Sequence, residues 1–219
     1  MRPRNLLRYA PHVDETEKSG LRERKKLATR EALSAAALRL AMERGPDNVR
    51  VDDIAEAAGV SPRTYNNYFS SREQAIVAAV AAERALRVGA AVRARPDDEP
   101  LARAVVEAVV EQYSTVDEPG RAELALITSA PGLRAAFLDT VSAVEQPLAA
   151  AIAERAGRDE RTAAVLAAAV AAAARVGAER WLRSWVTGNA LLVVPGGSLP
   201  DLLREALLPL APALDAPAR

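Results

Sequence analysis

The sequence predicts an all-α protein built from two helical parts, with about nine helices in total. Apolar residues recur at intervals of three and four along most of the chain, which is the period of a helix with one buried face. Alanine, the best helix former, accounts for 49 of the 219 residues. No stretch shows the alternation of apolar and polar residues that a half-buried strand needs.

Four helices are expected in the N-terminal part. Gly45 and Pro46 end the first, and Gly59 is suited to end the second because glycine tolerates the left-handed backbone at a helix C-terminus. The hydroxyl groups of Ser61 and Ser71 can cap the third and fourth helices. The expected ranges are 21–44, 51–58, 62–68 and 71–95.

Longer helices follow, separated by proline and glycine. We expect them at 101–115, 120–129, 132–155, 159–187 and 198–210, and Pro147 should kink or split the third of these. The organisation is then a disordered tail (1–20), a first domain (21–70, with its central motif at 51–69), a connecting helix (71–95), a second domain (96–213) and a C-terminal tail (214–219).

Composition excludes several kinds of site. The chain has no cysteine and one histidine, His12, so a metal site built from these residues and a histidine-dependent triad are not expected, and no cofactor is predicted. The first 19 residues lack an apolar core of signal-peptide length. The most apolar run, 162–174, is short and followed by Arg175, so no membrane contact is expected. A cytoplasmic location is the expectation.

The net charge of zero hides an asymmetry. Residues 1–95 carry 18 Lys/Arg against 12 Asp/Glu, and residues 96–219 carry 11 against 17. The halves therefore have charges of +6 and −6. A basic half joined to an acidic half points to nucleic acid as the partner of the first.

Residues 51–69, VDDIAEAAGVSPRTYNNYF, carry the sharpest pattern. Two short helices separated by a glycine-containing turn form a helix-turn-helix unit, whose second helix can enter the major groove of DNA. Ala55 and Gly59 let the two helices approach, and Val60 should fill the seam between them. Residues 21–70, with the first three of the expected helices, are thus predicted to form a three-helix helix-turn-helix DNA-binding domain.

The third helix is unusually polar. Tyr65 and Phe69, four residues apart, should pack inward. Arginine and asparagine can each bond two atoms of a base edge, so the predicted base contacts are Arg63, Asn66 and Asn67. Taken singly, each of these three is more often a solvated surface residue; their combination in a capped helix after a glycine turn favours DNA reading.

Hydroxyl groups and cations around this unit suit the DNA backbone. The run LRERKK is by itself typical of a solvated helix end, but beside a helix-turn-helix it favours phosphate or minor-groove contact. The predicted phosphate or minor-groove contacts are Lys25, Lys26, Arg50, Ser61, Thr64, Tyr68 and Arg72.

Residues 22–80 resemble the TetR family of bacterial transcriptional regulators. The resemblance rests on REALSAAALRLAMERG, on IAEAAGVS followed by T-x-x-x-YF, and on SSREQAIVAAV. Ala41 and Pro46 stand where the family usually has aromatic residues, which suggests a smaller local core to which Met42 could contribute. Arg50 replaces the usual Ser or Thr cap, and Asn66 stands where an aromatic residue is common, which could alter base preference.

The resemblance implies that the C-terminal part is a helical ligand-binding and dimerisation domain. Apolar lining favours a hydrophobic or amphipathic effector, and spacing alone leaves open whether the lining is a pocket or core. The predicted effector pocket is Val105, Val109, Tyr113, Leu126, Phe137 and Val141. The last two long helices are the expected dimer seam, through Ala171, Ala174, Trp181, Leu203 and Leu207, with intramolecular core as the alternative. Trp181 and Trp185 share a helix face, as core, interface or pocket residues.

The predicted function is a ligand-responsive repressor that binds a palindromic double-stranded DNA operator as a homodimer and is released by a small molecule. The first alternative is a constitutive or architectural DNA-binding protein without an effector, which a filled C-terminal core would favour. The second is an enzyme using carboxylates such as Glu107, Glu111 and Glu145, which the absence of a histidine there and of a phosphate-binding glycine loop disfavours.

Overall fold

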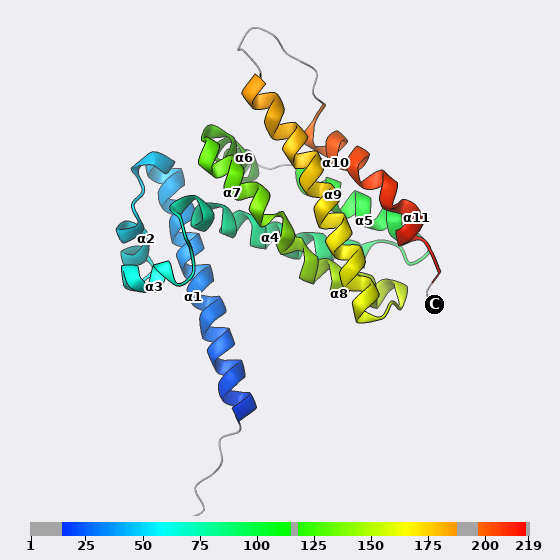
Figure 1. Cartoon of the computed structure of the whole chain (residues 1–219), viewed down its shortest axis with the longest axis horizontal. Coiled ribbons are helices and arrows are strands. Elements are labelled where there is room, and N and C mark those ends of the chain that lie inside the picture. Colours follow the sequence, from blue (N-terminus) through cyan, green and yellow to red (C-terminus); the bar gives the residue numbers. More distant parts are fainter. Residues whose placement is uncertain (1–14, 115–117, 188–196, 218–219) are drawn as a thin grey trace, which may run out of the picture.

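The computed structural model describes residues 15–114, 118–187 and 197–217, and these residues form helices and connecting turns with no strand. Figure 1 shows two units: α1 to α3 on one side, and a bundle of the later helices on the other, joined by α4. The predicted all-α class with an N-terminal three-helix unit and a larger helical part is confirmed.

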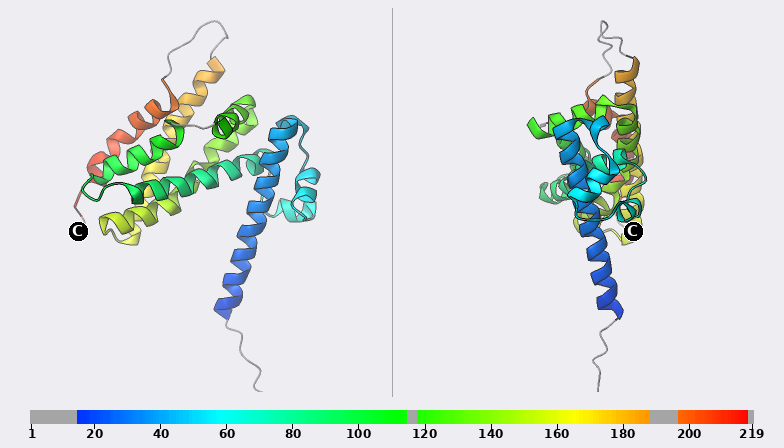
Figure 2. Two further views of the ribbon diagram at one scale, coloured as in Figure 1. Left: turned by 180° about the vertical axis from the view of Figure 1, so that it is seen from behind. Right: turned by 90° about the vertical axis from the view of Figure 1, so that its left-hand side faces the viewer.

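The N-terminal unit contains α1 (Glu15–Arg44), the short 3-10 helix η1 (Pro46–Asn48), α2 (Val51–Ala57) and α3 (Pro62–Asn66). Helix α1 begins within the segment expected to be a disordered tail, so the expected start of this helix was wrong. All side chains of residues 21–28 are exposed, because this part of α1 projects beyond α2 and α3 (Figures 1 and 2). Because this part of α1 has no buried face, its sequence shows no apolar periodicity from which a helix could be predicted.

Helix α4 (Arg72–Ala94) joins the two units. It packs against α1 on one side and against α5, α7 and α8 on the other. Its buried residues run from Ala75 to Val92, and most of the apolar ones belong to one continuous hydrophobic core that includes both units.

The C-terminal bundle follows the expected order. Its helices are α5 (Leu101–Ser114), α6 (Glu118–Ser129), α7 (Pro131–Thr140), η2 (Val141–Val144), α8 (Glu145–Ala156), α9 (Glu160–Thr187), α10 (Leu199–Leu207), η3 (Leu208–Leu210) and α11 (Ala211–Leu214). The single helix expected over 132–155 is split by η2, just before Pro147, as this proline predicted. Helix α9 lies between α8 and α10 and contacts both (Figure 1).

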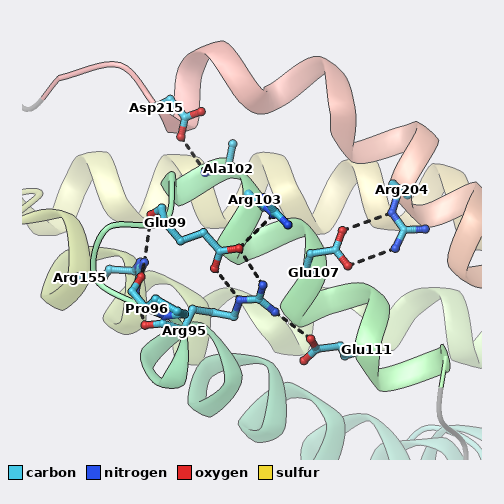
Figure 3. Close-up of polar contacts among 10 residues, drawn as sticks. All are labelled: Arg95, Pro96, Glu99, Ala102, Arg103, Glu107, Glu111, Arg155, Arg204 and Asp215. Atoms are coloured by element: carbon cyan, nitrogen blue, oxygen red, sulfur yellow. Dashed lines mark hydrogen bonds and ion pairs between the residues drawn. The ribbon is translucent and has the colours of Figure 1, made fainter.

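Ion pairs and hydrogen bonds fasten the turn between α4 and α5 (Figure 3). Arg95 donates to both carboxylate oxygens of Glu99, at 2.6 and 2.7 Å, and to Glu111 at 2.8 Å. These hydrogen bonds hold the pKa of Glu99 below its usual range. Arg155 of α8 donates to the backbone carbonyls of Arg95, Pro96 and Glu99. Helices α4, α5 and α8 are thus tied together at the end of the bundle far from α1.

Part of α9, Glu160–Arg183, is long and apolar enough to cross a membrane by length and composition alone. The sequence interpretation ended the apolar run before Arg175 and therefore took it as too short to cross a membrane, whereas the helix continues past this arginine. The helix packs against α8 and α10, and 39% of its most apolar window is buried inside the structure. A core helix of a helical bundle meets the same test.

Close contact between α9 and α10 depends on Gly177. A Cβ atom at this position would lie 2.9 Å from the backbone oxygen of Leu202. We expect Gly177→Ala to lower the free energy of unfolding by about 1–3 kcal/mol, because backbone cannot move aside as a flexible side chain can. Thermal or urea unfolding followed by circular dichroism measures the change.

Gly20→Ala is the matched control, because a Cβ atom at Gly20 would meet nothing within 4 Å in exposed helix. There the higher helix propensity of alanine should give a neutral or slightly stabilising effect. Equal stabilities of Gly177→Ala and the unmodified protein would contradict this packing account.

Candidate nucleic-acid interface and ligand cavity

The turn between α2 and α3 is built on Gly59, whose φ of +68° lies in the left-handed region. The amide of Gly59 donates to the carbonyl of Glu56 at 3.0 Å, and that of Val60 donates to the carbonyl of Ala55 at 2.9 Å. Ile54 and Ala55 are fully buried beneath the turn, and Val60 packs against the same core. The helix-turn-helix geometry predicted from the sequence is present.

Helix α3 begins at a serine cap. The hydroxyl oxygen of Ser61 accepts from the backbone amide of Thr64 at 3.1 Å, and the two hydroxyl groups lie 2.9 Å apart. Pro62 occupies the first turn, where its missing N–H costs nothing. Both hydroxyl groups also remain predicted phosphate contacts.

Two aromatic side chains anchor α3 from below. Tyr65 and Phe69 are 1% and 3% exposed, with ring centroids 5.8 Å apart, as predicted. The hydroxyl of Tyr65 donates to the backbone carbonyl of Ser71 at 2.8 Å, which fixes α3 to the start of α4. Arg30 of α1 lies 4.5 Å from the ring centroid of Phe69 and donates to the carbonyl of Tyr68 at 3.2 Å. Arg30 therefore helps to hold α3 against α1, a role that the sequence did not reveal because Arg30 is one of several cations on the same helix.

Because Tyr65 and Phe69 are buried, the opposite side of α3 presents polar side chains to solvent. Arg63, Asn66 and Asn67 are all exposed, so the three predicted base contacts share the outer side of α3 and its C-terminal cap. Thr64 and Tyr68 are half-buried beside them.

The flanking cations fall into two groups. Lys25, Lys26 and Arg50 are exposed. Arg72 instead donates to the carbonyls of Asp47 and Val49, at 3.1 and 3.2 Å, and pairs with Glu73 at 2.8 Å. Its guanidinium therefore holds η1 against α4, and a phosphate contact by Arg72 would have to share these donors.

Arg50 does not cap α2 with its side chain. Its backbone amide donates to the carboxylate of Asp53 at 3.1 Å, which satisfies the reverse half of a capping box. The guanidinium of Arg50 is therefore not required by the cap.

A cavity of about 60 Å³ lies in the C-terminal bundle, lined from α4, α5, α7, η2, α9 and α10. Four of the six predicted pocket residues line it: Val109, Tyr113, Phe137 and Val141. Val105 and Leu126 do not; they are 0% and 9% exposed members of the surrounding core. Helical spacing places core and cavity residues on the same face, so it could not separate them.

Arg84 of α4 also lines the cavity, and the sequence interpretation missed it. It is 5% exposed, donates to Glu123 of α6 at 3.2 Å and lies 5.3 Å from the ring centroid of Tyr113. The available signal was its position four residues from both Val80 and Val88, in the apolar phase of α4. Burial raises the pKa of Tyr113, against the opposing effect of the nearby charges of Arg84 and Arg87.

The predicted dimer-seam residues are mostly inside the single chain. Ala171, Ala174, Leu203 and Leu207 are 3%, 7%, 2% and 0% exposed, and Ala174 and Leu203 line the cavity. Side chains with so little free surface cannot form the main contact with a second copy, so the intramolecular alternative describes them better. Trp181 is half-buried against the core.

The side chain of Trp185 lies outside the described residues, as does His12. Among the residues that the structure describes, no three His, Cys, Asp or Glu side chains are grouped so as to hold a metal ion.

Comparison with known proteins agrees with this architecture. The profile of the bacterial regulatory proteins of the TetR family matches residues 33–80, and that of the MftR C-terminal domain matches residues 99–215. The chain is 33% identical over 200 residues to the HTH-type transcriptional regulator TcmR of Streptomyces glaucescens, covering 86% of this chain and 88% of that protein. The chain belongs to the TetR family.

As a TetR-family member the chain is a DNA-binding transcriptional regulator and not an enzyme. The crystal structure of Thermus thermophilus FadR, a TetR-family transcriptional repressor in complex with lauroyl-CoA, has the same fold. It aligns with a TM-score of 0.50 and 24% identity, covering 87% of this chain and 98% of that one.

Burial and, to a lesser extent, the charge of Glu73 raise the pKa of Tyr65 to about 12, against an ordinary value of 10. Below pH 10 both the folded and the unfolded protein keep this proton; between 10 and about 12 only the unfolded protein releases it. We therefore expect the free energy of unfolding to fall as pH rises from 10 to about 12, because of Tyr65. Tyr65→Phe should remove that contribution, and at neutral pH should cost about 1 kcal/mol by removing the hydrogen bond to the carbonyl of Ser71, which then keeps only the backbone amide of Ala75 as its donor.

Urea unfolding at a series of pH values gives the comparison, with Tyr68→Phe as the control for loss of a half-buried tyrosine hydroxyl in the same unit. If Tyr65→Phe and the unmodified protein lost stability in parallel above pH 10, the buried hydroxyl would not be the titrating group.

Proposed function

We propose that this TetR-family regulator is a ligand-responsive repressor that binds a palindromic DNA operator as a homodimer and is released by a hydrophobic or amphipathic small molecule. The observation that carries the proposal is the position of the cavity. It is lined by α4, the same helix that packs against α1 of the DNA-binding unit.

The position of α4 supplies a route from ligand to DNA. Ala81, Arg84 and Val88 on α4 line the cavity, while Ala75, Ile76 and Val77 at its start are buried in the core. A cavity of about 60 Å³ holds only a few water molecules, so a larger ligand must move the helices around it. A ligand that binds better to the displaced arrangement of α4 shifts the population away from the DNA-binding form.

The cavity also bears on the alternative of a constitutive DNA-binding protein. A filled C-terminal core would have favoured that alternative, because nothing could then enter. The mostly apolar cavity among five helices and η2 favours a ligand-responsive regulator instead.

A second copy is needed because one helix-turn-helix makes too few contacts for specific operator affinity. Helix α9 offers an exposed seam of small apolar residues, Val165, Ala168, Ala172 and Val176, at helical spacings of three, four and four. Val165 and Val176 are 64% and 52% exposed. We assign the homodimer contact to this seam, in place of the buried residues expected from the sequence.

Base reading by α3 can be tested on a duplex that the unmodified protein selects from a randomised library. We expect Arg63→Ala, Asn66→Ala and Asn67→Ala each to weaken binding by about 1–3 kcal/mol and to relax the sequence preference at one position. Lys25→Ala and Lys26→Ala should weaken binding to all sequences alike, and each should lower the salt dependence by about one released counterion.

Arg39→Ala is the matched control, because Arg39 is an exposed α1 cation already bonded to Glu43 at 3.1 Å. Unchanged affinity and specificity in both Arg63→Ala and Asn67→Ala would refute the assignment of α3 as the reading helix.

The dimer seam can be tested by introducing a charge at its centre. We expect Ala172→Glu to convert the dimer to a monomer, because two carboxylates would face each other across a twofold axis without partners. Light scattering coupled to size exclusion gives the mass. Ala82→Glu, at an exposed alanine of α4, should remain dimeric; a dimeric Ala172→Glu variant would place the interface elsewhere.

A further inference from the structure

Arg84 is a buried cation with incomplete pairing. The only hydrogen bond that the structure gives its guanidinium, among the described residues, is the one from Nη2 to Glu123. Its Nε and Nη1 atoms are sealed from solvent and have no hydrogen-bond partner within the described part of the chain. A buried donor without a partner destabilises the fold, because it has lost the hydrogen bonds that an exposed donor makes to water. The two unpaired nitrogen atoms of Arg84 are therefore suited to bind an acceptor from a ligand.

The surroundings of Arg84 show what kind of acceptor fits. Arg84 lines the cavity, and the other lining residues are mainly alanine, valine, leucine and phenylalanine, with Tyr113 and Thr140 as the uncharged polar ones. Burial raises the pKa of Tyr113, so its hydroxyl keeps its proton at neutral pH and adds no negative charge. Glu123 itself is not part of the lining. The cavity therefore presents a positive charge within apolar walls.

We infer that Arg84 anchors an acidic effector, a molecule with a carboxylate head and an apolar body. A carboxylate oxygen accepts from Nη1 or from Nε of Arg84, which lie on different edges of the guanidinium, and the apolar body packs against Val88, Val109 and Phe137. This inference rests on the proposed ligand response and narrows it from any hydrophobic molecule to an anion. Hydrogen bonds between two charged groups are about twice as strong as neutral ones, so the charge determines the choice of ligand.

The bond to Glu123 gives the site a built-in competitor. The carboxylate of Glu123 neutralises part of the charge of Arg84 and ties α6 to α4. A ligand carboxylate arriving on the cavity side competes with Glu123 for the same cation. Removing the charge of Glu123 should therefore strengthen binding of an acid and leave binding of a neutral molecule nearly unchanged.

Titration calorimetry on the full chain tests this with two matched pairs of probes: decanoate against 1-decanol, and 2-naphthoate against 2-naphthalenemethanol. We expect the unmodified protein to prefer at least one carboxylate over its neutral partner by about tenfold or more. Arg84→Met should abolish this preference while keeping affinity for the alcohol. Glu123→Gln should increase it.

Arg87→Met is the control, because Arg87 is an exposed arginine on the same helix, paired with Glu83. It should keep the full preference. If Arg84→Met does not fold because Glu123 loses its bond to Arg84, the double variant Arg84→Met/Glu123→Gln removes both charges and should show the same loss of preference.

Three outcomes would overturn the inference: binding of neither carboxylate by the unmodified protein, equal binding of acid and alcohol, or a preference that survives in Arg84→Met. Release of the protein from its selected DNA by an alcohol but not by an acid would reject the acidic effector and leave the ligand-responsive repressor standing. Failure of the unmodified protein to bind any selected DNA would reject the proposed function by a separate measurement.

Discussion

The close packing of α4 against both units is the constraint on which the rest of the structure depends. Near its start, Ala75, Ile76 and Val77 are fully buried. Near its end, Gly89 allows α8 to approach so closely that a Cβ atom there would lie 2.9 Å from the backbone oxygen of Pro147. A helix fixed so tightly at both ends cannot shift within the bundle without changing its contact with α1, and that makes it the natural link between cavity and DNA-binding unit.

Small side chains make this arrangement possible and also limit it. With 4% aromatic residues and 49 alanines, the chain builds its core mostly by bringing helices close together. Aromatic rings are therefore placed where a larger volume has to be filled: Tyr65 and Phe69 beneath α3, and Tyr113 and Phe137 around the cavity. The first pair fixes the orientation of α3, and the second leaves space between helices that alanine alone would have closed.

Local chemistry was predictable from the sequence, and choices that depend on tertiary contact were not. The caps at Ser61 and Ser71 are set by neighbouring residues, and both form as predicted, with acceptor distances of 3.1 and 3.2 Å. The apolar phase of α10, in contrast, is the same whether Leu203 and Leu207 face a second copy or their own bundle. Only the packing of α9 and α5 on α10 decides this, and it buries both within the chain. Arg84 could not be interpreted from the sequence either. It stands among the apolar positions of α4, and its role depends on neighbours from other helices.

The two halves of the chain differ in how far their cations are paired within the protein. In the acidic half, arginines are held within the chain: Arg155 donates to backbone carbonyls of the α4–α5 turn, and Arg204 of α10 donates to Glu107 of α5 at 3.2 Å. Among the described residues, Lys25, Lys26 and Arg63 make no such pair, and all three are exposed. Cations already paired within the chain would have to give up a partner to meet a phosphate, whereas unpaired exposed cations give up only water and counterions. The surface that we propose to contact DNA is therefore distinguished by exposed cations that form no ion pair within the described part of the chain, more than by its number of cations.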